Sequence, residues 1–202
     1  MAPEGHRDCE GWGKSVNRRT VLGGCTAAVL FTRAARADEA EDPTRAERPQ
    51  KGDQLVYFTG DKEGAPIKPD ELKVGDEPVL AWAYDPVKKV PRDGSRLNMV
   101  LVLRLDPTRL GKAEGKLAAE GVVAFSAICT HQQCPVTEWL SGLQHLRCPC
   151  HQSEYDPMHE AAVVGGPAPR PLPALPLAIA DGLVQVAGPF NSKVGGETQG
   201  TG

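Results

Sequence analysis

The stretch "ICTHQQCPVTEWLSGLQHLRCPCHQSEYD", residues 128–156, is the most informative part of this chain. It holds four of the six cysteines and three of the five histidines among 202 residues. Thiols and imidazoles gathered at such short spacings are typical of a metal centre. The spacing is Cys129-x-His131-x-x-Cys134 and then, after a gap, Cys148-Pro149-Cys150-His151.

Three chemistries could use these four cysteines and the two neighbouring histidines. A pair of disulfides suits an exported chain, but it leaves both histidines without a role. A tetrahedral zinc site takes two thiolates and two imidazoles and leaves two cysteines spare. An iron–sulfur cluster with two thiolate and two imidazole ligands, together with one disulfide, employs all six residues.

The paired motifs "CTHxxC" and "CPCHxSxY" resemble the Rieske iron–sulfur domain of cytochrome bc complexes and of the small subunit of arsenite oxidase. The double motif is highly specific. The resemblance is strong over residues 121–188 and extends at fold level from about residue 55. It implies a mostly β fold, a Rieske-type antiparallel β-sandwich with a small cluster-binding subdomain at about residues 126–174.

The resemblance also implies a role for each residue of the motifs. Cys129 and Cys148 would bind one iron of a Rieske-type 2Fe–2S cluster, and His131 and His151 would bind the other. Neutral imidazoles in place of two anionic thiolates raise the reduction potential. The remaining cysteines, Cys134 and Cys150, would form a disulfide that ties the two loops together.

Further residues match the resemblance, and two depart from it. Ser153 and Tyr155 stand where the family places hydroxyl groups that donate hydrogen bonds to a bridging sulfur and to a cysteine sulfur. The stretch 165–177, "GGPAPRPLPALPL", is similar to the proline loop that covers the cluster. Gln133 and Gln152 replace the usual glycines, so we expect a different loop geometry near the electron-exchange surface.

The N-terminal segment predicts an export signal over residues 1–37. Arg18 and Arg19 precede an apolar run, residues 20–31, and "Ala35-Arg36-Ala37" follows as a signal-peptidase site. The paired arginines resemble the twin-arginine type, which exports folded proteins. The apolar run is much shorter than the roughly 20 residues that cross a membrane. We therefore expect a cleaved signal and a protein in the periplasm or on the outer face of the cytoplasmic membrane.

Short apolar runs between turn signals predict a mostly β domain over residues 55–190. A flexible leader at 38–54 and a disordered tail at 191–202 flank it. The one plausible helix is 108–121. Asp181-Gly182 predicts the turn of a hairpin at 177–188. The other expected strands lie at residues 55–58, 78–84, 98–105 and 121–128.

The net charge of −3 offers no broad basic surface for nucleic acid. The chain contains no candidate nucleophile–base pair, so we expect an electron-transfer subunit rather than a stand-alone enzyme. The short apolar segment favours an arsenite-oxidase-like complex, with a large molybdenum subunit as donor and a cytochrome or copper protein as acceptor. The Ser153 and Tyr155 pair is more typical of the alternative, a bc-type quinol–cytochrome c reductase with a membrane quinol and cytochrome b on the donor side and cytochrome c as acceptor.

Two other classes fit the sequence less well. Rieske ferredoxins and oxygenase components lack the cysteine pair that Cys134 and Cys150 supply, and they are not exported. A zinc-binding structural module would use Cys129, Cys148 and the two histidines without redox chemistry. In either electron-transfer assignment, membrane association would come through a partner or through an uncleaved signal.

Overall fold

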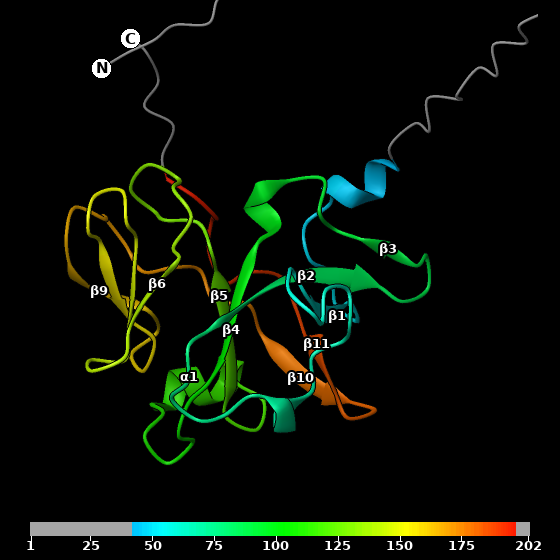
Figure 1. Ribbon diagram of the computed structural model, residues 1–202, viewed down its shortest axis with the longest axis horizontal. Coiled ribbons are helices and arrows are strands. Elements are labelled where there is room, and N and C mark those ends of the chain that lie inside the picture. Colours follow the sequence, from blue (N-terminus) through cyan, green and yellow to red (C-terminus); the bar gives the residue numbers. More distant parts are fainter. Residues whose placement is uncertain (1–41, 197–202) are drawn as a thin grey trace, which may run out of the picture. The chain divides into compact units, whose positions relative to one another are not determined.

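The computed structural model describes residues 42–196, apart from the side chains of residues 112–114. In this range the chain forms two antiparallel sheets, linked by loops and a few short helices (Figure 1). The strands are β1 (Gln54–Tyr57), β2 (Val79–Asp85), β3 (Val90–Pro91), β4 (Val100–Arg104), β5 (Val122–Ser126), β6 (Glu138–Leu140), β7 (His145–Arg147), β8 (Glu154–Asp156), β9 (Ala162–Gly165), β10 (Leu177–Ala180) and β11 (Leu183–Val186). The helices are α1 (Lys112–Leu117) and the 3-10 turns η1 (Pro43–Ala46), η2 (Pro69–Glu71) and η3 (Arg96–Asn98).

The larger sheet has the strand order β10-β11-β1-β2-β4-β5, with β3 paired to β2. Its two ends approach each other, because Ala174, just before β10, forms a bridge with Phe125 of β5. The amide of Leu175 also donates a 2.9 Å hydrogen bond to the carbonyl of Ala124. The sheet therefore curls toward closure, which protects its edge strands from pairing with other chains.

Strands β4 and β5 are buried on both faces, which explains their continuous apolar runs. Successive side chains along a strand point to opposite faces. Val100 and Val102 pack in the core of the larger sheet, with Leu55, Ile67 and Val184. Leu101 and Leu103 of the same strand pack in a second core together with residues of the smaller sheet. These two strands therefore connect the larger sheet to the part of the chain that carries the motifs.

The smaller sheet has the order β6-β7-β8-β9 and lies to the side of β4 and β5, in yellow and green in Figure 1. Its strands have three or four residues each. Such short strands stabilise little by themselves. They share the second core, in which Leu146 and Tyr155 are almost completely buried beside Phe125.

The structure confirms the mostly antiparallel β fold class, and the four predicted strands and the hairpin match observed strands within a few residues. Asp181 and Gly182 both have positive φ, of 53° and 73°, as a tight hairpin turn requires. The predicted helix at 108–121 is reduced to Lys112–Leu117. Glycines at 111, 115 and 121 disfavour helix, which explains the difference. In the smaller sheet, a strand was predicted at His145, which begins β7, whereas β6, β8 and β9 were not predicted.

The domain extends beyond the expected boundaries at both ends. Residues 42–54 were expected in a flexible leader, but they contain η1 and the start of β1. Asp53 is 3% exposed and forms an ion pair with Arg92. Val194, in the expected disordered tail, is also buried. The boundary predictions failed because these contacts are made by isolated residues that have no periodic pattern.

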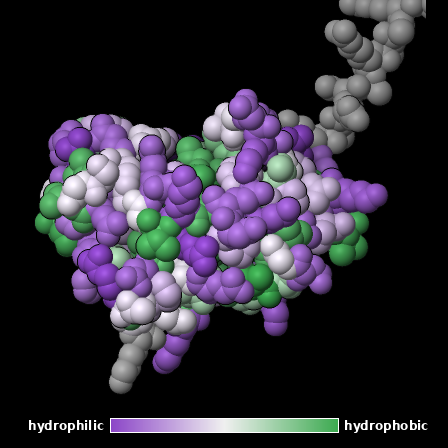
Figure 2. All heavy atoms as spheres, turned by 60° about the horizontal axis from the view of Figure 1, so that its bottom comes forward, coloured by the Kyte–Doolittle hydropathy of each residue, from purple (hydrophilic) through white to green (hydrophobic). Residues whose placement is uncertain are grey.

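The predicted export signal lies outside the described residues. Within residues 42–196, no helix has the length and apolar character needed to cross a membrane. Figure 2 views the molecule from the side that lies at the bottom of Figure 1. Hydrophilic residues dominate this face, and hydrophobic residues appear only in separate small areas.

Candidate metal centre

Three loops meet at one end of the smaller sheet. In the antiparallel pairing, Glu138 at the start of β6 lies opposite Arg147 at the end of β7, and Arg147 lies opposite Glu154 at the start of β8. Glu154 in turn pairs with Gly165 at the end of β9. The first loop (residues 129–134), the second loop (148–153) and the proline loop (165–177) therefore all leave the sheet at the same end.

The first and second loops have the same backbone geometry. The amide of Cys129 donates to the carbonyl of Cys134, and the amide of Gln133 donates back to Cys129. The second loop repeats this pattern. The amide of Cys148 donates to the carbonyl of Ser153, and the amide of Gln152 donates back to the carbonyl of Cys148. Gln133 and Gln152 have φ of 58° and 60°. Both glutamines therefore adopt the left-handed conformation that favours glycine.

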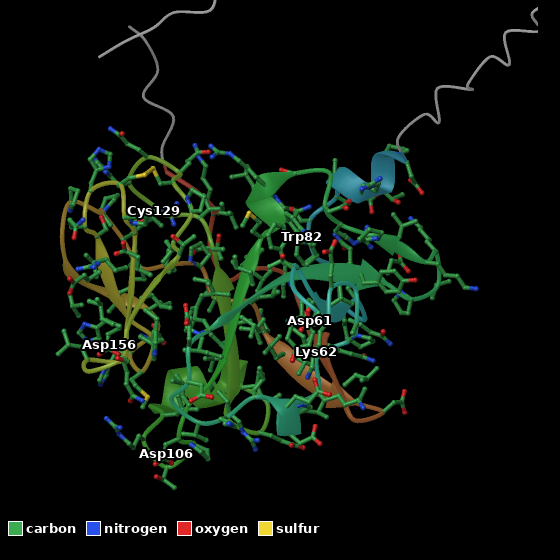
Figure 3. All side chains as sticks on the ribbon, viewed as in Figure 1. Asp61, Lys62, Trp82, Asp106, Cys129 and Asp156 are labelled. Carbon is green, nitrogen blue, oxygen red and sulfur yellow. A yellow bond between two sulfur atoms is a disulfide. The ribbon has the colours of Figure 1, made fainter. Side chains whose placement is uncertain are left out.

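The four cysteines separate into a buried pair and a bonded pair. Cys129 and Cys148 are free thiols with 1% and 0% exposure. Cys134 and Cys150 form a disulfide that joins the first loop to the second. Figure 3 shows Cys129 among the loops at this end of the smaller sheet, where sulfur atoms gather. The disulfide leaves the two thiols as the only unbonded cysteines among the described residues.

The two motif histidines lie against each other, one from each loop. The ring centroids of His131 and His151 are 4.7 Å apart and the rings are nearly perpendicular, at 87°. His151 is exposed and His131 is partly buried. The Nδ1 atom of His131 is buried and has no hydrogen-bond partner among the described residues. A buried imidazole nitrogen without a partner is costly unless it binds a ligand such as a metal ion.

Two hydroxyl groups lie beside the thiols. The Tyr155 hydroxyl is 3.2 Å from the Cys129 Sγ and also accepts a 3.3 Å hydrogen bond from the Thr130 amide. Both Tyr155 and Ser153 are 0% exposed. Ser153 Oγ is buried and has no partner among the described residues. The Tyr155 hydroxyl therefore already lies against a thiol, whereas the Ser153 hydroxyl has no partner among the described residues.

Burial governs the ionisation of this site. Burial raises the pKa of the Cys148 thiol, and the neighbouring Cys129 thiol raises it further. Burial also raises the pKa of Tyr155 well above its usual range, so its phenol stays protonated and can donate. Two adjacent buried thiolates are unfavourable without a cation. A bound metal centre supplies that positive charge and makes thiolate ligation favourable.

The donor set fits a cluster of two irons better than a single ion. Among the described residues, one trio brings its ligand atoms within 4.8 Å of each other, namely Cys134, Cys148 and Cys150. Two of these are already bonded in the disulfide. The ligand atoms of one tetrahedral zinc ion lie closer to each other than this 4.8 Å limit. Among the described residues, no three of Cys129, His131, Cys148 and His151 meet this limit, which a single tetrahedral ion would require of its ligands.

The structure adds residues that the motif did not predict. Thr130 is completely buried, and its hydroxyl donates a 2.7 Å hydrogen bond to the carbonyl of Arg170 in the proline loop. Gly166 lies so close to the second loop that a Cβ atom would come within 2.6 Å of the Gln152 carbonyl oxygen. The sequence signal for Thr130 was its place between two predicted ligands. The sequence signal for Gly166 was its place in the stretch that resembles the proline loop.

A hollow of about 650 Å³ opens beside the first loop. Arg96 reaches it from η3 and donates a 3.1 Å hydrogen bond to the Gln133 carbonyl. The hollow is lined by Arg96, Thr130, His131, Gln132, Gln133, Pro167 and Pro169. His131, which is partly buried, therefore borders an open hollow that also has the basic residue Arg96 in its lining.

The chain matches a known family and several characterised relatives. Residues 63–176, more than half of the chain, match the Rieske [2Fe-2S] domain. The cytochrome bc1 complex Rieske iron-sulfur subunit of Streptomyces lividans is 39% identical over 152 residues, which cover 72% of this chain and 85% of that protein. The subunit of the same name from Streptomyces coelicolor is 32% identical over 188 residues, covering 88% of this chain.

The match to the Streptomyces coelicolor subunit covers 51% of that protein, about half of its length. A putative respiratory nitrate reductase subunit Rieske from Haloferax mediterranei is 36% identical over 107 residues, which cover 52% of this chain and 48% of that protein. A 2Fe–2S cluster is the cofactor of the matched domain. The paired loops, the matched domain and these relatives together place this chain in the family of Rieske iron–sulfur proteins.

Proposed function

We propose that this chain is the Rieske subunit of a bc-type quinol–cytochrome c reductase and carries single electrons from a membrane quinol toward a cytochrome c. The observation that carries this proposal is a pair of buried free thiols in the same two loops as two adjacent imidazoles, one of which is exposed. Two relatives named as cytochrome bc1 subunits support the choice of complex.

The proposed ligands divide by chemistry. Cys129 and Cys148 bind one iron as thiolates, and His131 and His151 bind the other as neutral imidazoles. The unpartnered Nδ1 of His131 supports this assignment, because a buried imidazole nitrogen without a hydrogen-bond partner can serve as a metal ligand. When bound, a 2Fe–2S cluster with two imidazole ligands supplies a one-electron carrier of raised potential.

The other residues of the site tune and hold the ligands. Tyr155 donates its hydrogen bond to Cys129 Sγ, and Ser153 supplies a second buried donor. Hydrogen bonds to sulfur stabilise the more negative, reduced state and so raise the potential. The Cys134–Cys150 disulfide holds the loops together. Thr130 links the first loop to the proline loop, which limits the access of water to the ligands.

The identity of the partners separates the bc-type assignment from the arsenite-oxidase-like assignment that the short apolar segment favoured. Both would use the same cluster and differ only in the electron donor and acceptor. We propose cytochrome b and a quinol on the donor side because the relatives carry the bc1 name. Export by the twin-arginine route to the outer face of the cytoplasmic membrane is part of this proposal, and the residues concerned lie outside those described.

The proposal is tested on the natively exported protein and on its membranes. Electron paramagnetic resonance after dithionite reduction should give the signal of a His-coordinated 2Fe–2S cluster, with an average g below the free-electron value. Affinity purification of the tagged chain should recover cytochrome b, and deletion of the chain should abolish quinol–cytochrome c reductase activity. Recovery of a large molybdenum subunit instead would overturn the choice of complex.

A matched pair of variants tests the ligand assignment. His151→Ala should remove the cluster signal. His159→Ala changes an exposed histidine in the turn after β8, where it contacts Asp156, and should leave the signal unchanged. A silent spectrum together with stoichiometric zinc in the purified protein would contradict the electron-transfer function.

A further inference from the structure

The C-terminal residues that follow β11 return to the candidate metal centre. Asn191 pairs with Ala174 of the proline loop through two hydrogen bonds of 2.9 Å, one from its backbone and one to its side chain. The next residues, 192–196, form a segment that we name the C-terminal strap. Its last three residues, Val194, Gly195 and Gly196, are all buried. Figure 1 shows this red segment running up to the loops of the smaller sheet.

The C-terminal strap lies directly on the backbone of the first loop. A Cβ atom on Gly196 would overlap the carbonyl oxygen of His131 and would come within 3.1 Å of the carbonyl oxygen of Thr130. Gly195 has a φ of 81°, which glycine adopts readily and other residues do not. The two adjacent glycines therefore have separate reasons, a close approach at Gly196 and a left-handed backbone at Gly195.

Arg170 fastens the C-terminal strap to the proline loop. Its Nη2 atom donates a hydrogen bond to the carbonyl of Gly195, and its own carbonyl accepts from the Thr130 hydroxyl. One residue of the proline loop thus contacts both the strap and the first loop. The first loop, the proline loop and the strap form one hydrogen-bonded assembly around His131.

The two loops are covered in parallel ways. Gly166 of the proline loop packs on the backbone of Gln152 and Ser153 in the second loop. Gly196 packs on the backbone of Thr130 and His131 in the first loop. Backbone covered by another chain segment has less freedom to move than backbone exposed to water. Each loop is therefore covered by a closely packed glycine. Gly166 of the proline loop covers the second loop, and Gly196 of the C-terminal strap covers the first.

We propose that the C-terminal strap is a positioning element for His131. It holds the backbone of the first loop and with it the orientation of His131, whose Nδ1 is buried, while His151 stays exposed. This proposal rests on the ligand role proposed for His131. It assigns to residues 192–196 a function that their composition, rich in glycine and polar residues, does not suggest.

Two truncations of the full chain test the proposal. One ends at Asn191 and lacks the C-terminal strap, and the other ends at Gly196 and keeps it. The readout is the rate at which diethyl pyrocarbonate modifies each histidine, followed by mass spectrometry. We expect the rate at His131 to rise several-fold relative to His151 when the strap is absent and to stay at the wild-type value when the chain ends at Gly196.

A glycine pair provides a test without truncation. Gly196→Ala should displace the first loop, raise the His131 rate and shift the g values of the reduced cluster. Gly188→Ala is the matched control, because its new Cβ atom would meet only Pro176, at 3.8 Å. This control should leave both readouts unchanged.

The outcomes separate this proposal from the proposed function. If both histidines of the chain that ends at Asn191 are modified at the wild-type rate, the proposed role of the C-terminal strap is wrong. An equal rise of the modification rate at both histidines would also contradict it, because such a rise indicates a general loosening of the fold. Absence of a cluster signal in the wild-type protein would instead overturn the proposed function. The ratio of the modification rates of His131 and His151 is compared between the truncated and the wild-type protein. This comparison tests the role of the C-terminal strap whether or not the wild-type protein gives a cluster signal.

Discussion

Gln133 and Gln152 occupy equivalent positions in the two loops, and both have a left-handed backbone. A residue other than glycine pays for this conformation with local strain of the order of 1 kcal/mol. The strain is tolerated because the amide of each glutamine donates to the carbonyl of the cysteine four residues earlier, Cys129 or Cys148, which closes the loop. The loop shape is therefore imposed by the disulfide and the backbone hydrogen bonds and does not require glycine.

Replacement of Gln152 by glycine should stabilise the protein by up to about 1 kcal/mol, because the strain is relieved at a position with an exposed side chain. Gln132→Gly is the matched control. Gln132 is also exposed but is not among the residues with positive φ. There glycine only adds freedom to the unfolded chain, and it should destabilise by roughly 0.5–1 kcal/mol. Thermal unfolding of the two variants should shift in opposite directions, and a loss of stability in Gln152→Gly would contradict the strain argument.

Tyr155 provides a second test at the residue scale. Its hydroxyl lies 3.2 Å from Cys129 Sγ, and burial keeps it protonated. If its hydrogen bond is about 1 kcal/mol stronger in the reduced state, Tyr155→Phe should lower the potential by roughly 40 mV, since 59 mV corresponds to a tenfold change in a one-electron equilibrium. Ser153→Ala should act in the same direction. Protein-film voltammetry measures both shifts.

Tyr57→Phe is the control for these two variants. The Tyr57 hydroxyl bonds to Glu71 on the surface, 3.2 Å away and outside the site. The reduction potential of the Tyr57→Phe variant should equal that of the wild-type protein. Unchanged potentials in Tyr155→Phe and Ser153→Ala as well would rule out the proposed tuning role of the two hydroxyls.

At the scale of elements, the segment before β1 is fastened to the domain by one buried arginine. The side chain of Arg92 is 4% exposed and pairs with Asp53, also 4% exposed, at 2.6 Å. Arg92 further contacts Glu47 at 2.7 Å and Asp85 at 3.2 Å. Glu47 and Asp53 belong to the segment before β1, and Asp85 is the last residue of β2. The ion-pair cluster therefore joins residues 42–53 to the larger sheet.

Removal of Arg92 should destabilise the domain strongly. Arg92→Ala leaves the buried carboxylate of Asp53 without its partner, a change that costs about 3–5 kcal/mol. Arg45→Ala is the control, because the ion pair of Arg45 with Asp93 is much more exposed, at 39% and 23%. Such exposed pairs contribute about 0–1 kcal/mol. Urea unfolding of both variants measures the difference, and equal losses would show that burial of the Arg92 cluster is unimportant.

At the scale of the whole molecule, stability should decrease in acid. Hydrogen bonds from backbone amides or side chains lower the pKa of several carboxyl groups in the folded protein, namely Asp42, Glu71, Asp85 and Asp106. A carboxyl group with a lowered pKa contributes stability above its ordinary pKa. This contribution is lost as the pH falls through the ordinary value and on to the lowered one. The melting temperature should therefore fall progressively below about pH 4.

Asp106 allows this expectation to be checked at one position. The pKa of its carboxyl group is lowered first by the side-chain hydrogen bond from Thr108. Asp106→Asn should therefore be less stable than the wild-type protein at neutral pH and should approach it in acid, where the wild-type carboxyl is protonated. A stability difference that stays constant between neutral and acidic pH would contradict the linkage.

The sequence by itself determined the core strands, the hairpin at Asp181-Gly182 and the six residues of the motifs. Each of these features has a local pattern in the sequence, either a run of apolar residues or a fixed spacing of cysteines and histidines. Most of the short strands of the smaller sheet were beyond prediction because three-residue segments such as Glu138–Leu140 carry too little periodicity. Their pairing depends on the core they share with β4 and β5.

Only the tertiary structure decided which other segments cover and fasten the two loops. The contact of Thr130 with Arg170, the glycine covers at positions 166 and 196, and the burial of Asp53 with Arg92 all join segments that are far apart in the sequence. Small and polar residues make these contacts, and a single sequence assigns such residues to loops and tails. Their role arises from close approach between backbones, which is a property of the folded chain rather than of any local pattern.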